Sequence, residues 1–263
     1  MWVEWGGLKL GPLESQRVVI EGLPVVRMCE AQVVDKIFGD LSAGRGGWIV
    51  TANLDFMQRA SEDPGARDLY SGADLIVADG APLLWAARLM GCPLPERVAG
   101  SDLVWVLAER AALENRSLYL LGGDGEDASA AAEELRRRFP RLKIAGVSSP
   151  WLSLPPTAAE LAAVCEEVVA AQPDLVYAGF GSPKQELVIE ALRSDLPSAW
   201  LMGCGISLGF VAGTVPRAPR WMQKSGVEWV HRMWTEPRRL GPRYMRNIPY
   251  AIRLLWNARS RES

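Results

Sequence analysis

The stretch ADLIVADGAP, residues 73–82, indicates the class of fold most directly. Its first six residues, Ala73 to Ala78, form a short and mostly apolar run, which is typical of a strand buried on both faces. The strand is expected to end at Asp79-Gly80. A helix is then expected over Pro82–Met90, because a proline in the first turn and a glycine just past the end, here Gly91, are common at helix borders. A buried strand that leads at once into a helix is the repeating unit of parallel α/β sheets.

The same alternation continues along the chain on both sides of this stretch. Further strands are expected at residues 48–51, 118–121, 142–147, 175–178 and 199–202, and a hairpin or two strand fragments at 18–26. Helices are expected at 35–41, at 101–115 with Ser101 as the N-cap, at 157–171 and at 184–193. One more helix is expected to begin at residue 54, and another to follow the turn at 122–125 and to end at residue 138. The pattern predicts an α/β fold with a Rossmann-like, mostly parallel sheet flanked by helices.

The alternation stops after Val215, and the sequence beyond it has a different composition. From Arg217 to Arg261 there are eleven Lys or Arg against two acidic residues, a net charge of +9. The remainder has 18 basic and 29 acidic residues, a net charge of −11. We therefore divide the chain into an α/β catalytic domain, residues 1–216, and a basic, Trp-rich helical appendage, residues 217–263. Such a tail indicates an anionic partner, either a membrane surface or a nucleic acid.

Other features of the 263 residues bear on the location of the protein. The first ten residues contain Glu4 and lack a basic run followed by an apolar one, so no signal peptide is expected. No apolar segment approaches the ~20 residues that span a bilayer. Four scattered cysteines in apolar contexts, without Cys-x-x-Cys spacing, are expected to be buried thiols in a reducing cytosol. A cytoplasmic protein is therefore expected.

Ligands of parallel α/β sheets bind beyond the carboxyl ends of the strands. This rule selects Thr51 and Asn53, Asp79 and Gly80, and the turns at 122–125, 179–185 and 203–209. At the strand end, Asp79 either points a carboxylate into the crevice or caps the helix that follows it. Thr51 and Asn53 either hydrogen-bond a hydroxylated ligand or stabilise a turn.

The turn from Gly179 to Glu186 carries the strongest local signal for an anionic ligand. Two glycines and a Ser-Pro step let backbone N–H groups approach a diphosphate at a helix N-terminus, although an ordinary helix start would look similar. Lys184 adds a positive charge there, and Gln185 can donate or accept hydrogen bonds. The turn at 122–125 lacks the spacing of a dinucleotide fingerprint, which favours a flexible connection over an NAD site.

The sequence argues against catalysis by a metal ion or a histidine. His231 is the only histidine, which excludes a multi-histidine metal site and disfavours a Ser-His-Asp triad. There is also no Asp-x-Asp motif, through which many transferases hold a divalent ion on a nucleotide diphosphate. Cations and helix N-termini would have to stabilise a departing diphosphate, and no cofactor or metal is expected.

An ordered set of blocks resembles the WecG/TagA/CpsF glycosyltransferases of bacterial surface-polymer synthesis over roughly residues 17 to 250. The blocks are Thr51-Ala-Asn53, Ala78-Asp79-Gly80, Pro95-Glu-Arg97-Val-Ala-Gly100-Ser-Asp102, Gly179-Phe-Gly-Ser-Pro-Lys-Gln185-Glu186 and Arg217-Ala-Pro-Arg220-Trp221, followed by Glu228-Trp229, Arg232 and Glu236-Pro237-Arg238-Arg239-Leu240. One departure lies at Gly203-Cys-Gly205-Ile-Ser-Leu-Gly209-Phe210, where the family often has Gly-x-Gly-x-x-Phe-Asp-Phe.

The resemblance implies a reaction and a set of site residues. An N-acetylmannosamine-type sugar would pass from UDP to a polyprenyl-diphosphate-linked amino sugar, with inversion and without a metal, in the synthesis of a polymer such as teichoic acid or exopolysaccharide. Asp79 would be the base that accepts the proton of the acceptor hydroxyl. Arg97 would help to hold the sugar or diphosphate. Thr51, Asn53 and Gln185 would line the donor and acceptor pocket, and Gln185 is counted with Asp79 and Arg97 among the catalytic residues. The expected substrate-binding set is completed by Gly80, Gly181, Lys184, Gly203 and Gly205.

The resemblance also implies a role for the basic tail. The acceptor is dissolved in the membrane, so basic, Trp-bearing helices would dock the enzyme on the anionic inner face of the cell membrane. Four arginines of the tail are expected to contact the membrane or the diphosphate: Arg232, Arg238, Arg239 and Arg243. The apolar surface of the tail also allows self-association into a homo-oligomer. Alternatives are a UDP-sugar-binding regulatory protein without turnover, a related hexosyl or uronosyl transferase, and, less favoured, a nucleic-acid binder.

Overall fold

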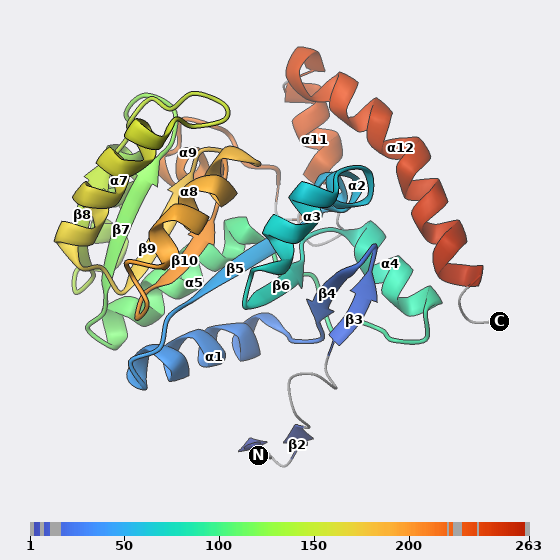
Figure 1. Ribbon diagram of the computed structural model, residues 1–263, viewed down its shortest axis with the longest axis horizontal. Coiled ribbons are helices and arrows are strands. Elements are labelled where there is room, and N and C mark those ends of the chain that lie inside the picture. Colours follow the sequence, from blue (N-terminus) through green and yellow to red (C-terminus); the bar gives the residue numbers. More distant parts are fainter. Residues whose placement is uncertain are drawn as a thin grey trace.

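The computed structural model describes residues 3–5, 8–10, 17–219, 221–222, 228–235 and 237–260 (Figure 1). Within these ranges the centre is a six-stranded sheet in the order β6-β5-β10-β9-β7-β8, in which every neighbouring pair is parallel. Its strands are β5 (Gly47–Ala52), β6 (Leu75–Ala78), β7 (Ser117–Gly122), β8 (Lys143–Ser148), β9 (Leu175–Gly179) and β10 (Trp200–Gly203). The predicted α/β class and the parallel sheet are confirmed.

Two antiparallel hairpins lie outside this sheet. The first joins β1 (Val3–Trp5) to β2 (Leu8–Leu10). The second joins β3 (Arg17–Ile20) to β4 (Leu23–Val26), as expected for residues 18–26, and packs beside β6.

Helices cover both faces of the sheet and make two hydrophobic cores. One face packs against α2 (Leu54–Glu62), α3 (Pro64–Ser71), α4 (Ala81–Leu89), α7 (Ala158–Ala171) and α8 (Lys184–Arg193). The other packs against α1 (Glu30–Ser42), α5 (Gly100–Leu113), α6 (Asp127–Arg138) and α9 (Ser207–Ala212). Strand β5, next to the edge strand β6, explains the arrangement, because Trp48 and Val50 enter the first core while Ile49 enters the second. Successive side chains of a strand point to opposite faces, so a strand with helices on both sides must be apolar throughout.

Some expected borders are wrong. The helix expected at 101–115 begins at Gly100, and its N-cap is Ala99, which makes no side-chain capping bond. Ser101 is not the cap, because its hydroxyl accepts a hydrogen bond from Arg217 instead. The helix expected to begin at residue 35 begins at Glu30, where the Gln32 side chain accepts the backbone N–H of Cys29 and stabilises the first turn.

The cysteines are also less buried than expected. All four are free thiols, but only Cys204 is buried, and the other three are partly exposed. Cys204 lies directly after β10 in the second core, whereas Cys92 and Cys165 pack at the margin of the first core and Cys29 is the N-cap of α1.

The C-terminal helices pack against the α/β fold near the β6 edge of the sheet. They are α11 (Glu228–Thr235) and α12 (Pro237–Ser260), and α12 packs on both α4 and α2 (Figure 1, red). Tyr250, Leu254 and Ala258, spaced four residues apart on one stripe of α12, are buried in the first core. Among the described residues, no helix is long and apolar enough to cross a membrane.

Candidate active site

The order of the strands places the candidate residues along one edge of the sheet. Asp79 follows β6, and Thr51 lies at the end of the neighbouring strand β5. The next strand, β10, ends at Gly203, and the one after it, β9, leads through a turn to Gln185. The structure therefore assembles two adjoining regions, a charged one around Asp79 and a glycine-rich one around Gln185.

Asp79 is held by a second helix and not by the helix that follows it. Its Oδ1 accepts a hydrogen bond from Nη1 of Arg97 at 3.2 Å, and its Oδ2 accepts the backbone N–H of Gly100, the first residue of α5, at 3.4 Å. The N-cap of α4 is Gly80, with no side-chain capping bond. The interpretation of Asp79 as the cap of its own helix is therefore wrong, and 26% of its side chain is exposed.

Burial raises the pKa of Asp79 from an ordinary value of 3.8 to about 6. The Arg97 guanidinium and the Gly100 N–H lower that pKa, while the carboxylates of Glu228 and Asp102 raise it. Burial dominates because a carboxylate loses more hydration free energy than its partners return. At neutral pH the group is ionised, yet its pKa is closer to neutrality than that of an exposed aspartate, which suits a general base.

Thr51 and Asn53 differ in what they do at the end of β5. A Cβ built on Gly100 would lie 2.9 Å from Oγ1 of Thr51, so α5 can start at this point only because residue 100 is glycine. Thr51 thus lies next to the N–H that binds Asp79. Asn53 caps α2, its Oδ1 accepting the N–H groups of Asp55 at 3.0 Å and Phe56 at 3.3 Å. Turn stabilisation is confirmed for the Asn53 oxygen, and a ligand contact would fall to its amide nitrogen.

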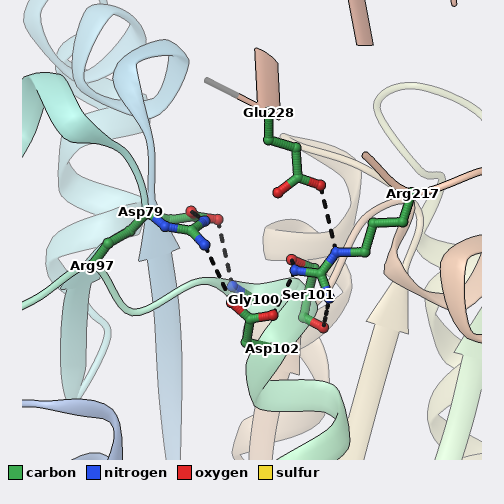
Figure 2. A network of polar contacts seen from close by, with 7 residues as sticks. All are labelled: Asp79, Arg97, Gly100, Ser101, Asp102, Arg217 and Glu228. Atoms are coloured by element: carbon green, nitrogen blue, oxygen red, sulfur yellow. Dashed lines mark hydrogen bonds and ion pairs between the residues drawn. The ribbon is translucent and has the colours of Figure 1, made fainter. Parts of the chain in front are cut away.

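Arg97 binds two carboxylates at once. Its Nη2 donates to Oδ2 of Asp102 at 3.2 Å while Nη1 donates to Asp79 (Figure 2). Asp102 lies in the first turn of α5 and accepts a second arginine, Arg217, at 2.5 Å. The guanidinium of Arg97 is therefore fixed in orientation before any ligand binds.

Gln185 joins the two glycine-rich turns on the other side of the site. It is 4% exposed, its Oε1 accepts the N–H of Gly205 at 3.0 Å, and its Nε2 donates to Glu186 at 2.7 Å. A Cβ built on Gly203 would lie 2.4 Å from that Nε2, so only glycine fits there. The positive φ values of Gly181, +72°, and Gly205, +51°, favour glycine for conformational reasons. The buried Gln185 side chain therefore links the two turns.

Comparison with known proteins identifies the family of this chain. The family model of the WecG/TagA/CpsF glycosyl transferases matches residues 18–263. This chain belongs to that family. It is 32% identical to an N-acetylglucosaminyldiphosphoundecaprenol N-acetyl-beta-D-mannosaminyltransferase of Bacillus spizizenii, covering 80% of this chain and 78% of the relative. Proteins of the same name from Bacillus subtilis, 28% identical over 83% and 82% of the two chains, and from Staphylococcus aureus, 30% identical over 81% and 83%, also match.

Two predicted positions of this glycosyltransferase have other neighbours than expected. The Lys184 ammonium donates to the backbone oxygen of Leu152 at 2.5 Å, which ties α8 to the loop before α7. At the position where the family often has aspartate, a Cβ on Gly209 would lie 3.0 Å from Oδ2 of Asp127. Asp127 of α6 is itself held by the hydroxyl of Thr214 at 2.6 Å. A carboxylate from another helix thus stands beside the altered position.

The arginines expected in the tail are described only in part. Arg238 is exposed in the first turn of α12. The side chains of Arg232, Arg239 and Arg243 lie outside the described residues. Among the residues that are described, no group of three or more His, Cys, Asp or Glu side chains is placed to hold a metal ion.

Sequence reasoning gave no role to Asp102, Arg217 or Glu228, although each stands in a block that matches the family. Arg217 precedes Pro219 in an irregular segment, and Glu228 begins α11. A charge pattern without a predicted partner gives no reason to bring residues 102, 217 and 228 together. Their positions in the matching blocks were the available signal.

Proposed function

We propose that this glycosyltransferase moves an N-acetylmannosamine-type sugar from a UDP donor to a polyprenyl-diphosphate-linked N-acetylglucosamine, with inversion of the anomeric carbon. The main support is the state of Asp79, a carboxylate at a strand end, ionised at neutral pH and held by Arg97 and a helix N–H beside Thr51. The three relatives carry this acceptor and this sugar in their names.

The transfer step requires one base and one stabilised leaving group. As the acceptor hydroxyl oxygen attacks the anomeric carbon, its proton passes to an Oδ of Asp79. The bond between that carbon and the UDP oxygen breaks, and UDP leaves with the electron pair. Attack from the face opposite UDP inverts the anomeric centre. Arg97 already holds Asp79 in the ionised form that this step needs.

The glycine-rich region fits the donor diphosphate. The turn at Gly179–Pro183 opens α8, and the one at Gly203–Ile206 precedes α9, so backbone N–H groups of both turns lie near helix N-termini, with that of Gly205 already bonded to Gln185. Such groups favour a phosphate oxygen and need no metal ion. We therefore expect turnover without a divalent cation.

One face of α12 fits the membrane in which the acceptor is dissolved. Met245, Ile248, Ile252 and Trp256 follow one another at helical spacing and are exposed, Trp256 by 73%. Arg246 and Arg253 are exposed beside them. An apolar stripe flanked by cations binds the interface of an anionic bilayer. The stripe lies on the side of α12 opposite to buried Tyr250 and Leu254. The stripe supports a peripheral position of the enzyme on the inner face of the cell membrane.

The test is to incubate the full chain with UDP-N-acetylmannosamine and a short polyprenyl-diphosphate-N-acetylglucosamine in vesicles, with EDTA present. We expect UDP release and a disaccharide lipid whose new linkage is β by NMR. No UDP release with any N-acylhexosamine or uronic-acid donor, together with tight UDP binding, would instead favour a regulatory protein without turnover. The altered turn at Gly209 is the observation that keeps this second candidate.

A further inference from the structure

A line of charges with alternating sign connects Asp79 to the C-terminal helices (Figure 2). The order is Asp79, Arg97, Asp102, Arg217 and Glu228, with ion-pair distances of 3.2, 3.2, 2.5 and 3.5 Å between neighbours. These five residues come from the end of β6, the loop before α5, the first turn of α5, the segment after α9 and the first residue of α11. Five separate pieces of the chain thus meet in one network.

The network is shielded from solvent more than an ordinary surface pair. The exposed fractions of its side chains run from 15% for Glu228 to 34% for Asp102. Exposed ion pairs contribute little because water screens them, but partly buried charges depend on their neighbours. A change of charge at one member is therefore felt at the others.

Arg217 connects α5 to α11 through ion pairs with Asp102 and Glu228. Its Nη2 donates to Oδ1 of Asp102 and, at 2.8 Å, to the hydroxyl of Ser101, while its Nε faces Oε1 of Glu228. Arg217 is 19% exposed. One guanidinium thus holds the first turn of α5 and the first residue of α11 together.

We propose that Asp102, Arg217 and Glu228 are positioning residues, which join α11 to Arg97 and so fix how that guanidinium faces Asp79. The inference rests on the proposed role of Asp79 as base. None of the three needs to touch substrate. Asp102 accepts a hydrogen bond from Nη2 of Arg97, which leaves Nη1 to donate to Asp79. Arg217 balances the charge of Asp102, which would otherwise draw Arg97 away from Asp79.

The charges around Asp79 act in opposite directions. Arg97 and the Gly100 N–H lower the pKa of Asp79, and Asp102 and Glu228 raise it. Neutralising Asp102 or Glu228 should therefore lower that pKa and make Asp79 a weaker base. Removing the charge of Arg217 leaves Asp102 and Glu228 unbalanced and should raise it. Opposite shifts from neighbouring members cannot arise from a general loosening of the fold.

The experiment is an NMR titration of the full chain labelled at aspartate Cγ, with the Asp79 signal assigned by its loss in Asp79→Asn. We expect Asp102→Asn and Glu228→Gln each to lower the midpoint by about half a pH unit or more, and Arg217→Gln to raise it. The matched control is Asp35→Asn, which removes another carboxylate that pairs with an α5 arginine, Arg110, and should leave the midpoint unchanged.

A second readout separates positioning from folding. Variants are compared only where thermal unfolding shows that they are folded, and if Arg217→Gln does not fold, Arg217→Met, which also removes the charge, takes its place, with a shift in the same direction. Folded Asp102→Asn and Glu228→Gln with the parent midpoint would overturn the proposal. The titration requires no turnover, so it decides the network even if every donor and acceptor fails, a result that would count against the proposed function alone.

Discussion

The two halves of the site consist of different kinds of residue. Around Asp79 at the end of β6, five charged side chains satisfy one another at partial burial. Around Gln185, by contrast, the ends of β9 and β10 carry glycines and a buried amide, which donates to a single buried carboxylate, Glu186. Proton transfer and phosphate binding therefore require different surroundings in the site. A base needs an adjustable electrostatic environment, whereas a diphosphate needs backbone N–H groups and room.

The charged half can be broken by one substitution at its end. Asp79→Asn keeps the shape of the side chain but cannot accept a proton, so kcat should fall by about 10²–10⁴-fold. Binding of UDP, which is assigned to the glycine-rich half, should stay within about threefold, because no group there changes. The comparison fails if UDP affinity and kcat fall together, measured by calorimetry and by UDP release.

The glycine-rich half can be broken by adding one methyl group. In Gly203→Ala the new Cβ would lie 2.4 Å from Nε2 of Gln185, and we expect a loss of about 1–3 kcal/mol in the free energy of unfolding, with weaker UDP binding. The control is Gly39→Ala in α1, where nothing lies within 4 Å of the new atom. That change should stabilise the protein by about 0.5–1 kcal/mol, since alanine is the better helix former. Equal effects of the two changes in urea unfolding would contradict the assigned packing.

Ionisation of Asp79 should lower the free energy of unfolding. Folding raises the pKa of Asp79 from 3.8 to about 6, so its ionisation disfavours the folded state fully above pH 6, partly between 3.8 and 6, and not below. Asp79→Asn should therefore raise the free energy of unfolding by about 1–3 kcal/mol at pH 7.5, with a gain that shrinks toward pH 4. A variant less stable than the parent at pH 7.5 in urea titrations would show that Asp79 is a structural anchor.

The smallest expected effect separates the two faces of α12. Trp256 is exposed and Leu254, two residues earlier, is buried with 3% exposure. Trp256→Ala should change the free energy of unfolding by less than about 0.5 kcal/mol, yet weaken binding to phosphatidylglycerol vesicles about tenfold. Leu254→Ala should cost about 2–4 kcal/mol of stability. Unchanged sedimentation of Trp256→Ala with these vesicles would remove α12 from the membrane contact.

The sequence predicted the sheet well because buried parallel strands are apolar and end in glycine or a polar residue. It predicted α8, Lys184–Arg193, and the end of α6 at Arg138 to the residue. It failed where a long-range partner decided the outcome. Ser101 looks like an N-cap, but Arg217, distant in sequence, takes its hydroxyl. Local capping rules contain no information about such a partner.

The site shows the same limit. Asp79, Thr51 and Gln185 lie at strand ends or in the turns and helix starts just beyond them, so the topology of a parallel sheet was enough to select them. The network through Asp102, Arg217 and Glu228 depends on how α11 packs, which no periodicity of the sequence gives. Asn53 has a side chain able to serve a ligand or a helix, and the structure was needed to show that its oxygen serves the helix.

The pH dependence of the transfer rate reports directly on whether Asp79 is the base. With saturating donor and vesicle-bound acceptor, the rate of UDP release should be half-maximal near pH 6, the pKa of Asp79, and reach a plateau above pH 7. The residual rate of Asp79→Asn should lack this step. A parent rate that stays constant from pH 5 to 8, or the same step retained in Asp79→Asn, would contradict the assignment of Asp79 as the base.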